Sequence, residues 1–290
     1  MIKFFRYHII LLGFIFQLMP LIAISQQHPF QNQADTLMSQ EILYTYPTPD
    51  ELLDVIEKEH LNFNNRHLNP VDNVNQYINT KTKNLNLGIY LADLAYAAFF
   101  SKRNQITKYV DVISQTSDDL LISAETKTKL KEDLIQNMEN LDSIYYLTNV
   151  YYYEIMHELE NNNSNSIMVI ISAGTYIESI YLSLSLIDKF SDENELVKKI
   201  AEQKNAFVSL LNTSKLYEQD YNVKEIIPYL ESIIDIYNQF KVEDKGKLVF
   251  IKKPDGTVRF KSAEKVIMNE KQFITFRNTI KEIRNEITLN

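Results

Sequence analysis

The sequence predicts an all-α protein: a multi-helix bundle followed by a small C-terminal β-hairpin and a docking helix. The 290 residues are 45% hydrophobic and 23% charged, which is typical of a globular chain with a substantial core. Apolar residues recur at steps of three and four along most of the chain, as in helices that bury one face. Only 247–260 combines short apolar runs with a central turn, as a hairpin does.

The first 25 residues have the layout of a secretory signal peptide. A short basic start precedes the apolar stretch 9–24, and Ala23 and Ser25 place small residues before a cleavage point. A permanent membrane anchor is the alternative, but Pro20 interrupts a stretch that would need about 20 apolar residues. We expect a periplasmic or secreted protein. It is not expected to be a lipoprotein, because the chain has no cysteine.

The helical elements follow a polar lead-in over residues 26–47. Thr48 is a candidate N-cap, and Glu51 completes a capping box at the start of the domain 48–240. Ser123 is expected to cap the longest helix, and Pro228 either kinks the last helix of this domain or lies in its first turn. The remaining expected segments are 71–100, a helix around 106–113, 124–160, 167–187, 193–212 and 222–240.

The tail 241–290 differs from the rest in pattern and in charge. Pro254-Asp255-Gly256 separates the two hairpin strands, and Asn269 is expected to cap a final helix with an apolar stripe. The tail has 12 basic and 7 acidic residues, whereas 26–240 has a net charge of −15. The tail either docks on the acidic bundle or serves as a partner-binding appendage. The mature chain, at −10, is not expected to bind nucleic acid or anionic membranes.

Two apolar segments share a sparse signature. Gly88 and Tyr90 precede Asp93 with nearly the same spacing as Gly174 and Tyr176 precede Glu178. This pattern indicates two related helical hairpins, or else a chance similarity. A glycine inside a helix costs about 1 kcal/mol relative to alanine. We therefore expect the two helices to cross at these glycines, the alternative being two separate helix ends or kinks.

Each segment carries one isolated acid. Asp93 is the only charged residue between Lys83 and Lys102, and Glu178 is the only one between Glu160 and Asp188. Both acids should be buried, and a buried carboxylate needs donors, a cation or a raised pKa. The possible donors are nearby tyrosines: Tyr90, Tyr96, Tyr176 and Tyr181.

Three interpretations of the isolated acids remain open. They are structural groups bonded within the protein, or they form a ligand- or cation-binding site with Tyr90 and Tyr176. In the third interpretation, the apolar segment 167–187 lies in a membrane. The sequence predicts no catalytic residues, no metal site and no cofactor. Glu154 and His157 form only half of a di-iron motif and are expected on a solvated face.

The run Asn86-Leu-Gly88-Ile-Tyr90-Leu-Ala-Asp93-Leu-Ala-Tyr96-Ala resembles a motif, NLGxYxADLxYA, of uncharacterised exported all-helical proteins of Bacteroidetes. The resemblance is loose over 70–240 and sharp only at 84–97. It implies a helical bundle at the periplasm or cell surface, and it implies no activity. Many members are lipoproteins, but this chain lacks the cysteine that lipid attachment requires.

The function expected from these observations is that of a non-enzymatic binding or interaction protein of the bacterial cell envelope. Its partner would be an envelope protein or a small ligand, with no stable membrane span after signal cleavage. The alternative is a cation- or ligand-dependent protein that uses Asp93 and Glu178 in the bundle core.

Overall fold

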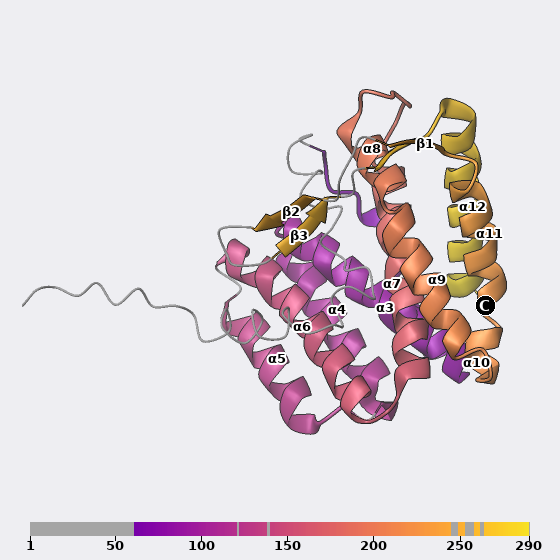
Figure 1. Cartoon of the computed structure of the whole chain (residues 1–290). Coiled ribbons are helices and arrows are strands. Elements are labelled where there is room, and N and C mark those ends of the chain that lie inside the picture. Colours follow the sequence, from indigo (N-terminus) through magenta and orange to yellow (C-terminus); the bar gives the residue numbers. More distant parts are fainter. Residues whose placement is uncertain are drawn as a thin grey trace, which may run out of the picture.

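The computed structural model describes residues 61–120, 122–137, 140–244, 249–252, 258–261 and 264–289. The expected signal peptide, the polar lead-in and the helix start at Thr48 lie outside these residues. The described part of the chain is mostly α-helical, as the sequence predicts (Figure 1).

Two apolar helices form the centre of the fold. They are α3 (Thr80–Phe99) and α7 (Asn165–Ser185), and most of the side chains on each are buried. They make their largest contact with each other, and both also contact α6 and α12. The surrounding helices are α4 (Arg103–Thr116), α5 (Ala124–Gln136), α6 (Leu141–Asn161), α8 (Glu195–Glu202), α9 (Lys204–Leu216), α10 (Tyr221–Lys224), α11 (Ile227–Tyr237) and α12 (Glu270–Leu289).

The helix expected over 71–100 begins later than its pattern indicates. Short 3-10 helices occupy Asn65–His67 and Val71–Gln76, and α3 begins only at Thr80. The side chain of Asn79 accepts a hydrogen bond from the Thr82 N–H, which makes Asn79 the N-cap of α3. Residues 61–79 are therefore not part of α3, and Asn69 in this segment contacts the centre of the fold.

The prediction of a single long helix over 124–160 is wrong, because the structure has two helices there. Ser123 caps α5 as expected, but α5 ends at Gln136 and Asn140 caps a new helix, α6. The apolar spacing continues across the break, so periodicity alone does not reveal it. The asparagines on either side favour caps over helix interior, which is the local signal for the break.

The two later helices are also divided. A break at Gln203 separates α8 from α9, and α10 precedes α11. Pro228 lies in the first turn of α11, where its missing N–H and fixed φ are tolerated.

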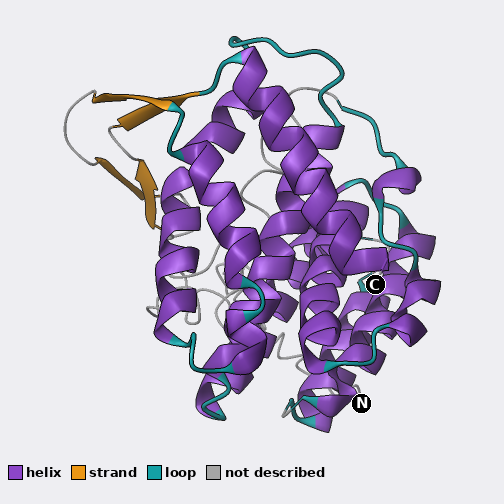
Figure 2. Ribbon diagram, turned by 90° about the vertical axis from the view of Figure 1, so that its right-hand side faces the viewer, coloured by secondary structure: helices purple, strands orange, loops and turns teal. Residues whose placement is uncertain are grey.

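The strands form a ribbon of two antiparallel ladders. The expected hairpin is present as β2 (Val249–Lys252) with β3 (Val258–Lys261), and β1 (Lys241–Asp244) pairs with β4 (Glu264–Ile267). Four residues join β1 to β2 but only two join β3 to β4, so the ladders do not share one register. Both ladders lie to one side of the helices in Figure 2.

The last helix packs onto the helical body. Asn269 and Gln272 exchange backbone and side-chain hydrogen bonds, which is a capping box at the start of α12. The helix contacts α7, α11 and α3. Its buried face contains the apolar stripe expected from the sequence: Phe273, Phe276, Ile280, Ile283 and Ile287.

Within the described residues, α7 is the one helix whose length and composition would allow it to cross a membrane. Most of its side chains are buried inside the protein, where α3, α6, α9 and α12 contact it. A buried core helix meets the same criteria of length and composition, so this finding alone does not indicate a span.

Candidate functional site

The backbones of α3 and α7 touch where the two helices cross. A Cβ atom built on Gly88 would lie 2.0 Å from the Ile171 carbonyl oxygen, and one on Gly174 would lie 2.0 Å from the Leu85 carbonyl oxygen. No side chain fits at either position. The Thr175 hydroxyl donates to the Gly88 carbonyl oxygen across the crossing, at 3.2 Å. The structure thus places the two helix-interior glycines at one crossing, which is the reason to tolerate their cost.

Asp93 and Glu178 lie together beyond this crossing, one on each helix. Both residues are fully buried, with 0% exposure. Burial raises the pKa of the Asp93 carboxyl, and the Glu178 carboxylate lies near enough to Asp93 for its charge to raise this pKa further. Two isolated acids that are 85 residues apart in sequence therefore form a pair in the core.

Arg284 of α12 forms an ion pair with Glu178. Its Nε lies 3.0 Å from Glu178 Oε2 and its Nη2 lies 3.2 Å from Glu178 Oε1, a bidentate arrangement. Nη2 also donates to the His67 carbonyl oxygen at 3.2 Å, and the guanidinium lies 4.8 Å from the Tyr181 ring centroid. Planar, bidentate pairing of this kind is the strongest form of Arg–carboxylate contact.

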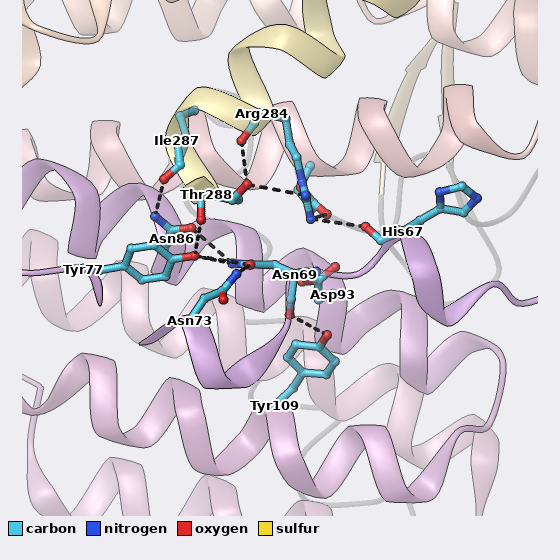
Figure 3. Close-up of polar contacts among 11 residues, drawn as sticks. His67, Asn69, Asn73, Tyr77, Asn86, Asp93, Tyr109, Arg284, Ile287 and Thr288 are labelled. Carbon is cyan, nitrogen blue, oxygen red and sulfur yellow. Dashed lines mark hydrogen bonds and ion pairs between the residues drawn. The ribbon is translucent and has the colours of Figure 1, made fainter. Parts of the chain in front are cut away.

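Asn69 is the centre of the polar network around the pair (Figure 3). Its backbone N–H donates to Asp93 Oδ2 at 3.0 Å, and its carbonyl oxygen accepts from the Tyr109 hydroxyl at 2.9 Å. Its side-chain amide donates to Asn86 Oδ1 at 3.2 Å and bonds the Tyr77 hydroxyl. The segment before α3 thus supplies the one N–H that reaches Asp93 among the described residues.

The same network caps the C-terminal end of α12. Asn86 donates to the Ile287 carbonyl oxygen at 3.0 Å, and the Tyr77 hydroxyl donates to the Thr288 carbonyl oxygen at 3.1 Å. The last carbonyls of a helix lack partners within the helix itself. These bonds and the Arg284–Glu178 pair fix α12 against α3 and α7.

The tyrosines expected to satisfy the acids have other partners. Tyr90 donates to the Pro70 carbonyl oxygen at 3.2 Å, and the Tyr96 hydroxyl accepts from the Asn64 N–H. Tyr176 lies in a different cluster, where its hydroxyl is 2.6 Å from that of Tyr237. Tyr181 contacts the Arg284 guanidinium with its ring. The structure thus brings Asp93 and Glu178 together and leaves Tyr176 away from them.

The electrostatics of the pair follow from its burial. Burial, and after it the negative charge of Glu178, raises the pKa of the Asp93 carboxyl well above its ordinary value. Arg284 and the Asn69 N–H act in the opposite direction. Burial disfavours the charged form of Arg284, but Glu178, Asp93 and Tyr181 together outweigh it and raise the pKa of the guanidinium.

Sequence reasoning did not single out Arg284 or Asn69. A local signal existed for Arg284: it lies four residues after Ile280 and beside Ile283, so helical spacing places it on the apolar stripe of α12. Arginines are rarely buried without a partner, so this placement indicates a buried acceptor for Arg284. No comparable local signal marks Asn69, whose role depends on where the segment before α3 runs.

The geometry describes a closed internal cluster rather than an open cleft. A surface pocket lies between α4 and α5, and none of its lining residues belongs to the cluster. No group of three His, Asp or Glu side chains suited to a metal ion occurs in the part of the chain that the structure describes. No family model, curated protein or solved structure matches this chain.

Proposed function

We propose that this chain is an exported, non-enzymatic protein that binds a partner in the bacterial cell envelope. The signal-peptide layout of its first 25 residues and its resemblance to exported helical proteins of Bacteroidetes favour this location. We propose that the β-ribbon makes the contact and that it binds an acidic surface of an envelope protein.

The separation of charge between the ribbon and the rest of the chain carries this proposal. Residues 245–263 have six basic side chains and one acidic side chain, a net charge of +5, whereas 26–240 has −15. The main contact of β2 and β3 is with each other, whereas β4 contacts α8 of the helical body. A basic ribbon on an acidic body attracts an acidic partner over several ångströms.

The tail consists of strands between Lys241 and Ile267 and of helix α12, which carries Arg284. Deletion of the whole tail would also remove α12 and with it Arg284. A loss of partner binding could then result from a disturbed fold, so it would not identify the contact. A sharper variant replaces 245–263 by Asn-Gly, which closes β1 and β4 in a two-residue hairpin turn because Asp244 and Glu264 are paired.

The test is affinity capture from envelope extract, with cross-linking to map the contact. We expect the full chain to retain a partner through the ribbon lysines, and the shortened variant to lose it. A second variant keeps the length of the ribbon but replaces Lys247, Lys252, Lys253 and Lys261 with Gln. It tests charge alone, and it should also lose the partner. Unchanged capture by both variants would contradict the proposal, as would binding to anionic lipid vesicles in place of a protein.

A cation- or ligand-dependent role for Asp93 and Glu178 remains the second candidate. One observation favours it: Asp93 Oδ1 finds no donor among the described residues. The bidentate contact of Arg284 favours the structural role instead, because the guanidinium stands where a bound cation would. Metal analysis of the purified protein, with thermal shift on adding divalent ions to the wild type and to Asp93→Asn, separates the two candidates. No metal and no shift in either protein would count against this role.

We further propose that the helices form a bundle that arose from duplicated hairpins. The crossing of α3 and α7 at their corresponding glycines supports this proposal, as does the helix that follows each of them, α4 and α8. Related sequences in which the two halves are more alike would support the duplication, and halves that diverge at both glycines would oppose it.

A further inference from the structure

Three ionisable groups in the core do not balance in charge when all of them are ionised. Asp93 and Glu178 are 0% exposed and Arg284 is 8% exposed, so two carboxylates would face one guanidinium. A net negative charge would then remain in the protein interior, which is costly without a further cation. Retention of one proton by the carboxyl pair makes the cluster neutral.

The hydrogen bonds indicate which atom holds this proton. Both oxygens of Glu178 accept from Arg284, so Glu178 has the partners of a carboxylate. Asp93 Oδ2 accepts from the Asn69 N–H, whereas Asp93 Oδ1 is buried and has no donor among the described residues. An oxygen with no donor, beside a carboxylate, is suited to carry a proton and donate it.

We propose that Asp93 and Glu178 form a proton-binding site. One proton sits on Oδ1 of Asp93 and is donated to the Glu178 carboxylate, whose two oxygens accept from Arg284. The proton links α3 to α7, and the guanidinium links α7 to α12. The three helices are therefore held by a chain of contacts that is complete only when the proton is bound.

The other polar groups around Asp93 do not compete for this role. Tyr109 of α4 and Tyr90 of α3 donate to backbone carbonyl oxygens. Burial raises the pKa of both hydroxyls, so they stay neutral. Within the described residues, the other titratable groups of this cluster are Tyr96 on the same helix as Asp93, Tyr181 on α7 and Tyr77 before α3, together with Glu178 and Arg284. The His67 ring contacts Tyr181 at the edge of the cluster.

The site makes stability depend on pH with a defined sign. The folded chain holds a proton that the unfolded chain releases near the ordinary Asp value, about 3.9. The stabilisation is complete below that pH and is lost as the pH rises towards the raised folded-state value. In this window the unfolding equilibrium constant rises by up to tenfold per pH unit.

The first test compares the full wild-type chain with Asp93→Asn from pH 5 to pH 9 by denaturant unfolding. Asparagine supplies a neutral amide donor in place of the carboxylic acid. We expect the ratio of the unfolding constants, wild type over variant, to rise with pH by up to tenfold per unit. Asp235→Asn, an exposed carboxyl on α11, is the matched control and should follow the wild type. A ratio independent of pH would overturn the proposal.

The second test does not depend on a variant that folds. Infrared spectra of the wild type with ¹³C-labelled aspartate should show the carbonyl stretch of a protonated carboxylic acid at neutral pH. This band should shift in D₂O and disappear at alkaline pH. Only carboxylate bands at neutral pH would mean that Asp93 is ionised, which would overturn the assignment of the proton.

Discussion

The α3–α7–α12 centre and the β-ribbon use charge in opposite ways. In the centre, Asp93, Glu178 and Arg284 are buried, and the guanidinium of Arg284 binds both oxygens of Glu178 at 3.0 and 3.2 Å. In the ribbon, residues 245–263 concentrate a charge of +5 that the ribbon itself does not balance. The isolated charges of the apolar helices therefore contact groups within the protein. The like charges of 245–263 are where we propose that a partner binds.

The largest effect should come from filling the crossing. In Gly88→Ala the new methyl would meet the Ile171 carbonyl oxygen at 2.0 Å, and backbone atoms cannot rotate away as a side chain can. The two helices must separate, so we expect a loss of about 4–5 kcal/mol or failure to fold. Urea unfolding measures it. Ser232→Ala, on the exposed face of α11, should change stability by less than about 0.5 kcal/mol. Similar stability of the two variants would mean that the backbones are not in contact.

Removal of the arginine should have the next largest effect. Arg284→Met keeps a long side chain but leaves Glu178 buried without its cation, which we expect to cost about 3–4 kcal/mol. The double variant Arg284→Met with Glu178→Gln should recover a large part of this loss, because no unpaired charge remains. Additive effects of the two substitutions would show that they do not act on one interaction.

The smallest effect on stability should come from the ribbon. Replacement of 245–263 by Asn-Gly keeps the inner ladder of β1 and β4, where Val266 is buried. We expect the free energy of unfolding to change by less than about 1 kcal/mol, as for other changes away from a core. Calorimetry of the shortened and full chains checks this expectation. A loss comparable to that of Gly88→Ala would remove the distinction between the two regions.

Much of the fold follows from local patterns in the sequence. The stripe of α12 and the two hairpin strands were predictable because their periodicity is local. The breaks at 137–140 and at Gln203 were missed because apolar spacing continues through them. Caps such as Asn140 compete with helix continuation, and the balance depends on tertiary packing.

The candidate site was predictable only in part. Glycines inside helices carry an energetic cost that points to close approach, and lone acids in apolar helices point to burial. The partners of those acids come from distant segments: Asn69 before α3 and Arg284 near the end of α12. Tyrosines adjacent in sequence were the wrong donors, because hydroxyls such as those of Tyr90 and Tyr109 reach nearby carbonyl oxygens instead.

The position of Arg284 also orders events during synthesis. Asp93 and Glu178 leave the ribosome long before α12, so until then their helices would meet with no guanidinium to neutralise them. The centre therefore matures only after residue 284 is available. If the chain is exported as proposed here, this delay would keep it unfolded until most of it has crossed the membrane.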